Sequence, residues 1–362
     1  MLDLTSSLYL GLRHSTAAKP GRDPLTTGVP AALAEAPEAA MAAEHLASLI
    51  GLTAATMAPS TLHAFWDLFP AIGACRIYVD ASTYPIGRWG AEHARCGGAS
   101  VRTFGHHDPA ALRRVVSSDG GHRPVILTDG LCPGCGRVAP VGDYLAIAER
   151  LGGSVVVDDT QALGILGTPA PGHPYGRGGG GTARWAGLAG PRLIIVASLA
   201  KGFGVPVAVV AGSRPVVRRY EARAETRVHC SPPSNAHLRA AADALACNAS
   251  RGDELRAHLA RLVMRFHTLL SRRGVRLTPG LFPVQTAWPG PGADVRDVHR
   301  RLGELGVRAV LHAPRCGQDL ALSFIITAAH RETDIDQAVR AIGTALSPAA
   351  ARSTARPKAV AR

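Results

Sequence analysis

Lysine, long apolar runs and a secretory leader are scarce or absent in this sequence of 362 residues. Only three of its 40 basic residues are lysine: Lys19, Lys201 and Lys358. No run approaches the ~18 uninterrupted apolar residues that a membrane-spanning helix needs. The first residues, MLDLTSSLYLGLRHS, also lack a basic stretch followed by an apolar core. We therefore expect no membrane partner and a cytoplasmic location.

The net charge of +13 is carried almost entirely by arginine, and 5% of the residues are aromatic. An excess of arginine beside abundant alanine, glycine and proline is typical of codon bias in a GC-rich genome. The arginines are scattered along the chain and form no stripe with interleaved aromatics, which a single-strand nucleic-acid binder would use. We predict no specific nucleic-acid partner, and a disordered basic tail at 348–362.

Seven cysteines, an odd number, suit a reducing compartment better than a disulfide scaffold. Cys132 and Cys135 form a single CxxC in a turn rich in glycine and proline. A structural zinc site needs four ligands, and no second pair follows at a useful spacing. A redox CxxC is expected at the start of a helix, which this turn does not provide. We interpret the pair as loop thiols and predict no metal.

The hydrophobic share of 46% and the charged share of 19% are typical of a globular protein, and the length suggests two domains. From about residue 75, short runs rich in valine and isoleucine alternate with amphipathic stretches. This alternation predicts an α/β fold whose mainly parallel sheet is sandwiched by helices. The predicted strands are 76–80, 100–104, 124–129, 154–158, 193–197 and 206–211, and the predicted helices are 86–96, 109–117 and 141–151.

One segment interrupts the alternation. Residues 169–190 include eight glycines, four of them in succession. Such a composition is unfavourable for helices and strands, so we predict a flexible surface connection.

The second half of the chain has a different pattern. Two helical stretches, 235–248 and 253–273, are followed by short runs typical of strands near 283–286, 307–311 and 320–326. This pattern predicts a smaller C-terminal α/β domain. The expected organisation is an N-terminal segment at 1–40, a large domain at 41–225, a small domain at 226–347 and the tail at 348–362.

Lys201 is the most informative single residue, because it is the only lysine between residues 20 and 357. Arginine stays protonated and cannot form an imine, whereas lysine can lose its proton and act as a nucleophile. Lys201 follows an apolar strand and opens a glycine-rich turn, SLAKGFG. Taken alone, it could equally be a solvated lysine in a loop.

Asp158 is its candidate partner. The run SVVVDD places two carboxylates directly after a continuous apolar strand. Ligand sites in open α/β sheets lie outside the carboxyl ends of the strands, where such a side chain reaches a cofactor. The alternative interpretation is helix capping, which is common for an aspartate before a helix.

Seven motifs, in order along nearly the whole chain, resemble those of the fold type I pyridoxal-phosphate enzymes. The resemblance is greatest to the α-oxoamine synthases, which include 8-amino-7-oxononanoate synthase and the glycine acyltransferases, and it extends to class I/II aminotransferases. It implies a homodimer with the active site at the interface. The motifs are LDLTSSLYLGL, VDASTYP, FGHHDPAAL, TDGLCPGCGRVAP, VDDTQALGILG, ASLAKGFG and ITAAHRETDID.

The resemblance assigns roles around the pyridoxal 5′-phosphate ring. Lys201 matches the lysine that forms the internal aldimine, and Asp158 matches the aspartate that keeps the pyridine nitrogen protonated. Tyr84 falls where the family has a histidine that stacks on the ring. Gln161 falls where the family has a histidine near the ring hydroxyl, and its amide can still donate a hydrogen bond there without titrating.

The resemblance also assigns the phosphate site. Ser198 matches a family threonine that binds the cofactor phosphate. Ser60 and Thr61 match a turn at the start of a helix, where backbone N–H groups favour an anion.

The substrate side departs from the family. Ser323 stands where the family has the arginine that grips the substrate carboxylate through a bidentate pair. Pro133 stands where the family has a serine, and Asp129 replaces a glutamate near the acyl substrate. The residues that match the family's cofactor site are therefore largely kept, whereas the arginine that binds the substrate carboxylate is not.

These matches predict a pyridoxal-phosphate-dependent transferase, in first place an acyltransferase similar to the α-oxoamine synthases with an altered substrate site. Its small-molecule partners would be an amine or amino acid and an acyl thioester carried by coenzyme A or a carrier protein. The alternatives are a class I/II aminotransferase, a decarboxylase or lyase, and a cofactor-binding protein without turnover.

Overall fold

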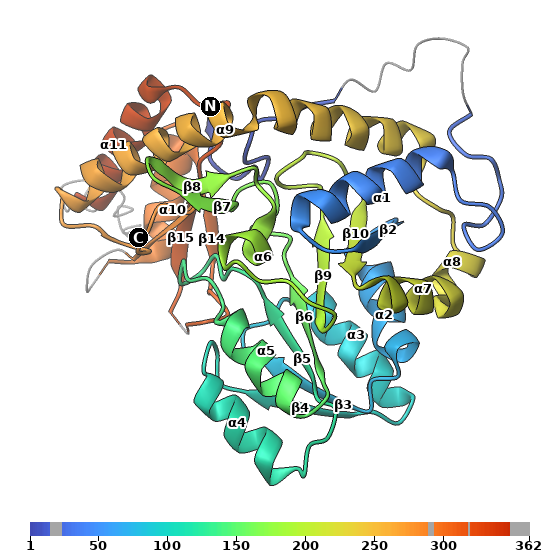
Figure 1. Ribbon diagram of the computed structural model, residues 1–362. Coiled ribbons are helices and arrows are strands. Elements are labelled where there is room, and N and C mark those ends of the chain that lie inside the picture. Colours follow the sequence, from blue (N-terminus) through green and yellow to red (C-terminus); the bar gives the residue numbers. More distant parts are fainter. Residues whose placement is uncertain (15–23, 289–292, 318, 348–362) are drawn as a thin grey trace, which may run out of the picture. The chain divides into compact units, whose positions relative to one another are not determined.

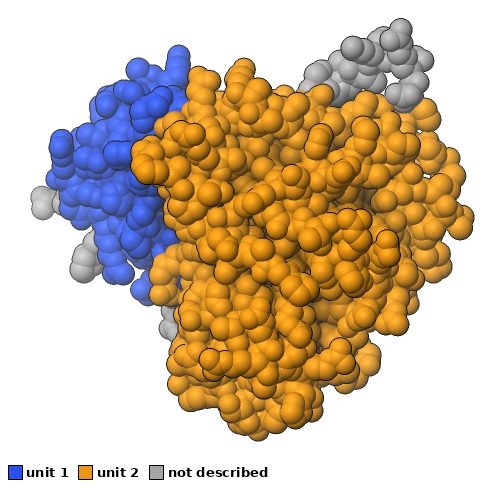
Figure 2. Space-filling view, in the orientation of Figure 1, with its two compact units in different colours: residues 1–7, 134–136, 258–362 blue, residues 8–133, 137–257 orange. Residues whose placement is uncertain are grey.

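The computed structural model describes residues 1–14, 24–288, 293–317 and 319–347, which form two compact units (Figures 1 and 2). The larger unit contains residues 8–133 and 137–257, and the smaller unit contains residues 1–7, 134–136 and 258–362. The predicted tail at 348–362 lies outside the described residues. The predicted domains at 41–225 and 226–347 stay a prediction, because compactness does not show which segments fold together. Within the described residues, no helix has both the length and the apolar character needed to cross a bilayer.

The larger unit is built on a seven-stranded sheet with the order β2-β10-β9-β6-β5-β3-β4. All its strands run parallel except β10, which pairs antiparallel with both β2 and β9. The predicted α/β class is confirmed. In sheet order the strands are Ala54–Ala58, Ala208–Gly212, Leu193–Ser198, Ser154–Asp158, Val125–Asp129, Arg76–Asp80 and Ser100–Phe104.

Helices cover both faces of this sheet (Figure 1). Successive side chains of a strand point to opposite faces, so Val155 and Val157 join one core and Val156 joins the other. This double burial explains why the parallel strands are continuous apolar runs. The first core includes α1 (Pro37–Ile50), α4 (Pro109–Ser118), α5 (Val141–Arg150) and the start of α9 (Asn235–Ser271); the second includes α2 (Thr61–Ile72), α3 (Pro85–Cys96) and α7 (Arg214–Arg223).

The predicted flexible connection at 169–190 is wrong. It forms most of the hairpin of β7 (Thr168–Ala170) and β8 (His173–Arg177), followed by the short helix α6 (Gly181–Trp185). Gly181 has a φ of +83°, and a Cβ atom there would lie 1.9 Å from Oδ2 of Asp159. The glycines therefore allow left-handed backbone and close packing rather than flexibility.

A buried arginine fixes this glycine-rich segment. Arg256 is 2% exposed, and its Nη1 atom donates to the carbonyl of Gly164 (2.9 Å) and to Oδ1 of Asn248 (2.8 Å). Its Nη2 atom lies 2.6 Å from Oδ1 of Asp253, and the same carboxylate oxygen accepts from the N–H of Gly178. Because a buried charge must be paired and hydrogen-bonded, Arg256 joins helix α9 to both ends of the hairpin.

The second correction concerns helix α9. The sequence predicted two helices, 235–248 and 253–273, but the structure has one continuous helix, Asn235–Ser271. The glycine between the two predicted helices is a packing site rather than a break. A Cβ atom at Gly252 would lie 2.4 Å from Oδ1 of Asn248 and 2.8 Å from Nη2 of Arg256, so only glycine leaves room for this pair.

The smaller unit contains an antiparallel sheet with the order β11-β12-β15-β14. The predicted strand runs near 283–286, 307–311 and 320–326 are confirmed, although the middle one is divided into β13 and β14. The first residues, β1 (Leu2–Asp3), pair parallel with β13 (Val307–Arg308). The other elements are β11 (Arg276–Leu277), β12 (Val284–Trp288), β14 (Val310–His312), β15 (Ala321–Ile325), α10 (Val295–Glu304) and α11 (Glu332–Leu346).

The Arg256 network predicts a stability loss. Arg256→Met should lower the free energy of unfolding by about 3 kcal/mol, because the paired groups around it lose their buried cation. The measurement is urea unfolding followed by circular dichroism. The control is Arg251→Met on the exposed side of the same helix, which should stay within ~0.5 kcal/mol of the wild type. Equal losses in both variants would contradict the role given to Arg256.

Candidate active site

Polar residues end four neighbouring parallel strands at one edge of the large sheet. Asp80, Asp129 and Asp158 are the last residues of β3, β5 and β6, and Ser198 is the last residue of β9. Asp129 and Asp158 lie directly opposite each other in the sheet register. The carboxyl edge of such a sheet is where ligands bind, so the predicted Asp158 and Ser198 lie at the expected place.

Thr160 links two of the predicted cofactor residues. Asp158 is 6% exposed, and its Oδ1 accepts a hydrogen bond from the N–H of Thr160 (3.1 Å). The hydroxyl of Thr160 in turn accepts from the N–H of Ser198 (3.0 Å). Sequence analysis assigned no role to Thr160, although the residue two positions after an aspartate commonly donates its N–H to that carboxylate in a turn.

Tyr9 links two further predicted residues. Lys201, the one lysine among the described residues, lies three positions after β9, and its carbonyl accepts from the N–H of Tyr9 (3.2 Å). The hydroxyl of Tyr9 donates to Oε1 of Gln161 at 2.5 Å. Tyr9 belongs to the first of the seven motifs, but sequence reasoning gave it no function.

Asp129 positions the residue that carries the candidate stacking ring. Its two carboxylate oxygens lie 3.0 and 3.2 Å from the N–H of Tyr84, the residue directly before helix α3. Asp129 is 8% exposed, whereas Tyr84 is 47% exposed. The resemblance placed Asp129 near the acyl substrate, and the structure shows that it also fixes the backbone at Tyr84.

The candidate phosphate turn begins helix α2. Ser60 is the N-cap residue, and its hydroxyl lies 2.8 Å from Nδ1 of His63. Thr61 is the first residue of the helix. The preceding strand ends at Ala58, which lies in one row of the sheet with Ala208 and Ser198. The start of α2 therefore lies at the same edge as Ser198.

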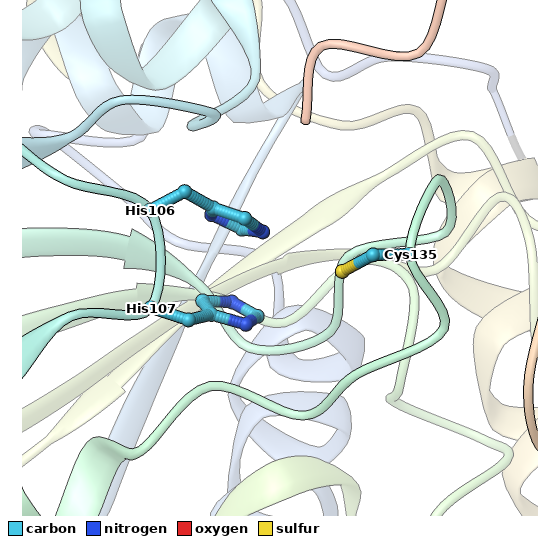
Figure 3. Close-up of side chains that lie close together, drawn as sticks. All are labelled: His106, His107 and Cys135. Carbon is cyan, nitrogen blue, oxygen red and sulfur yellow. The ribbon is translucent and has the colours of Figure 1, made fainter. Parts of the chain in front are cut away.

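A second carboxylate at this edge holds a pair of histidines that sequence reasoning missed. Oδ1 of Asp80 lies 2.7 Å from Nδ1 of His106, and Oδ2 accepts from the N–H of His107 (2.8 Å). Burial opposes ionisation of Asp80, but the hydrogen bonds of both histidines and of Ser82 outweigh it and lower its pKa. The centroids of the two histidine rings are 3.8 Å apart and the ring planes are tilted by 31° (Figure 3). Cys135, drawn in the same view, belongs to the smaller unit.

Asp159, next to Asp158, is fully buried. Its Oδ1 accepts from the hydroxyl of Thr182 (2.5 Å) and its Oδ2 from the N–H of Thr182 (2.9 Å). Burial raises the pKa of Asp159 to about 7 against the effect of these bonds, and the charge of Asp158 adds to the rise. Asp159 therefore attaches helix α6 to the end of β6.

Ser323 lies in the smaller unit, in the middle of β15, and is 2% exposed. Its hydroxyl lies 2.7 Å from Oγ1 of Thr286 and 2.7 Å from Nε2 of His312. Burial, together with the charge of Arg315, lowers the pKa of His312 and favours its neutral form. Ser323 is therefore part of a network of neutral polar groups.

The sequence profile described as aminotransferase class I and II matches residues 28–342. The chain belongs to the class I and II aminotransferase family. Curated members of similar sequence include the 8-amino-7-oxononanoate synthases of Aromatoleum aromaticum, 34% identical over 67% of this chain and 61% of that protein, and of Ralstonia pickettii, 32% identical over 76% and 66%. The matched region thus spans slightly less than two thirds of these relatives.

Solved structures with the same fold include two enzymes. Serine palmitoyltransferase from S. paucimobilis, with a bound PLP-myriocin aldimine, aligns with a TM-score of 0.81 at 16% identity, covering 95% of this chain and 86% of that one. The 8-amino-7-oxononanoate synthase of Francisella tularensis aligns with a TM-score of 0.73 at 20% identity, covering 95% and 97%. The predicted fold and the family's cofactor, pyridoxal phosphate, are confirmed.

The residues of this family member fit that cofactor. Lys201 supplies an amine, and Asp158 supplies a buried carboxylate on the adjacent strand of the sheet. The N-terminus of α2 and the turn after β9 lie at the same edge and suit a phosphate. The half-exposed ring of Tyr84 suits stacking.

The raised pKa of Asp159 predicts a pH-dependent effect of Asp159→Asn on stability. The folded wild type keeps a proton up to about pH 7, whereas the unfolded chain releases it above about pH 4. The wild type therefore loses stability as the pH rises through this window, on the order of 1 kcal/mol per pH unit. Asparagine does not titrate. The free energy of unfolding of the variant should therefore rise relative to that of the wild type over the same pH window, and the difference should stay constant above it.

The measurement is urea unfolding of both proteins at several values between pH 4 and pH 8. Asp243→Asn, at an exposed position of α9, controls for the loss of a carboxylate elsewhere. A constant difference between wild type and Asp159→Asn across the window would show that Asp159 is ionised in the folded state.

Proposed function

We propose that the protein is a pyridoxal-phosphate-dependent acyltransferase of the α-oxoamine synthase type, which joins an amine or amino acid to an acyl thioester. The observation that carries the proposal is the buried Asp158 at the end of β6 beside the turn that holds Lys201 after β9. Supporting it, the curated relatives are named 8-amino-7-oxononanoate synthases, and solved neighbours include serine palmitoyltransferase.

Lys201 and Asp158 would act at opposite ends of the cofactor. When bound, pyridoxal phosphate supplies an aldehyde that takes up an amine and a ring that accepts the electrons released at the adjacent carbon. Lys201 would hold the aldehyde in the resting enzyme and move a proton once its amine is displaced. Asp158, a buried carboxylate, would keep a proton on the ring nitrogen.

Other residues at the same sheet edge would hold the cofactor in place. Ser198 and the N–H groups at Ser60 and Thr61 would bind the phosphate. Tyr84, fixed at its backbone by Asp129, would lie against the ring. Gln161 would face the ring oxygen.

The substrate is proposed to lack a free carboxylate in the usual place, or to have it held by another side chain. Ser323 stands where the family places an arginine, and its neighbours Thr286 and His312 are polar groups without a fixed charge. A carboxylate buried without a cation loses a charge-assisted bond of about 1.5–3 kcal/mol.

A homodimer is proposed as the working assembly, in the cytoplasm. Helices α2 and α3 pack against each other and expose three large apolar side chains, Leu62, Trp66 and Trp89, at 38%, 40% and 54%. Light scattering should therefore give about twice the chain mass of 37.7 kDa, and a mass equal to one chain would contradict it.

Lys201→Ala should give a colourless protein, or one whose cofactor is removed by dialysis, because only an amine can bind the aldehyde covalently. The measurement is the absorption spectrum before and after borohydride, with peptide mapping of the reduced protein. Lys358→Ala is the matched control and should keep the spectrum. A reducible C=N bond in Lys201→Ala would show that another group holds the cofactor.

The reaction itself is tested by thiol release. Simple amines without a carboxylate, the amino acids glycine, alanine and serine, and a set of acyl-CoAs are added singly and in pairs, and free thiol is measured with a chromogenic reagent. An acyltransferase should release thiol only when amine and thioester are both present. Conversion of the cofactor to its amine form by the amino donor alone would favour an aminotransferase instead, and no response to any pair would favour a protein without turnover.

A further inference from the structure

The segment 8–14 near the N-terminus packs on the turn that contains Lys201. The N–H of Tyr9 donates to the carbonyl of Lys201, and Nε2 of His14 lies 2.8 Å from the carbonyl of Phe203. A Cβ atom at Gly204 would lie 2.5 Å from the carbonyl oxygen of Leu12. Backbone contacts thus fix Tyr9 beside the lysine turn, whatever its side chain does.

The side chain of Tyr9 is 1% exposed and reaches Gln161, which is 152 positions away along the chain. Burial raises the pKa of the Tyr9 phenol far above its usual value, so the hydroxyl keeps its proton and donates it. The oxygen of the Gln161 amide is the acceptor, at 2.5 Å.

The two ends of a glutamine amide differ, because the oxygen only accepts hydrogen bonds and the nitrogen only donates them. An amide whose oxygen is held by a phenol presents its NH₂ group in the other direction. The backbone at Gln161 is also fixed, because it lies in a turn in which the N–H groups of Ala162 and Leu163 both donate to the carbonyl of Asp159.

We propose that Tyr9 is a positioning residue that sets the orientation of the Gln161 amide, so that Gln161 offers its NH₂ group as a permanent donor to the ring oxygen of pyridoxal phosphate. The inference rests on the proposed function, in which Gln161 faces that oxygen. A glutamine held in this way has no proton to lose at any ordinary pH, unlike a histidine, so the donor is present throughout.

A fixed donor at the ring oxygen has a spectroscopic consequence. It would stabilise the tautomer of the Lys201-bound cofactor that has negative charge on this oxygen and a proton on Nζ of Lys201, and this tautomer absorbs at longer wavelength than the neutral one. The ratio of the two absorption bands at one fixed pH therefore reports the donor directly, without any turnover.

The experiment compares four cofactor-loaded proteins: wild type, Tyr9→Phe, Gln161→Ala and the double variant. Tyr9→Phe removes only the hydroxyl and keeps the backbone contact with Lys201. Each single variant should lower the ratio of long- to short-wavelength absorption by about tenfold, as expected when a hydrogen bond to a charged oxygen is lost. The double variant should lower it no further, because Tyr9 acts through Gln161.

Two controls separate positioning from packing. Tyr220→Phe removes a hydroxyl from another buried tyrosine, one without a hydrogen-bond partner among the described residues, and should leave the ratio unchanged. Gln161→Glu keeps an acceptor for Tyr9 but has no N–H donor when ionised. It should lower the ratio as Gln161→Ala does, and it serves as the test if Tyr9→Phe proves unstable to heating.

An unchanged ratio in Tyr9→Phe, or in Gln161→Glu, would overturn the inference, and so would additive effects in the double variant. These results would leave the proposed function intact, because the wild type would still show its Lys201-dependent absorption. Absence of that absorption in the wild type would overturn both.

Discussion

The burial of carboxylates at the ends of parallel strands is the constraint on which the rest of the site depends. A buried charge is tolerated only when it is hydrogen-bonded, and each of these carboxylates accepts from a backbone N–H group of a turn beside the strand ends. The hydrogen bonds to the carboxylates thus fix the turns, and the turns carry the side chains that would face a ligand. The pairs are Asp80 with Ser82 and His107, Asp129 with Tyr84, and Asp158 with Thr160.

The turn that contains Lys201 is fixed by close backbone packing. A Cβ atom at Gly202, next to Lys201, would lie 2.4 Å from the carbonyl oxygen of Leu163, so the two backbones touch with no side chain between them. The carbonyl of Gly164, the residue after Leu163, accepts a hydrogen bond from Arg256. The turn that carries the candidate nucleophile is therefore supported by a series of contacts that ends in helix α9.

The predicted cofactor residues and the predicted substrate residue differ in how far they keep the family pattern. Asp158, Ser198 and Lys201 lie together at the sheet edge, linked by Thr160 and by the β9 strand. In the smaller unit, Ser323 joins a buried polar network where a cation would be expected. Under the proposed function, this combination would keep the means to stabilise a carbanion and would select a different amine, because one fold can serve several reactions.

The sequence by itself determined the α/β class and the positions of six of the seven strands in the large sheet, and it pointed to Asp158 and Lys201 as candidate site residues. These follow from local signals, because strands buried on both faces are continuous Val/Ile runs and a single lysine stands out among arginines. Only the tertiary structure decided the hairpin in the glycine-rich segment, the continuity of α9 and the contacts of Tyr9. Each depends on groups far apart along the chain, such as Tyr9 with Gln161 or Arg256 with Gly164, and a local pattern holds no information about such pairs.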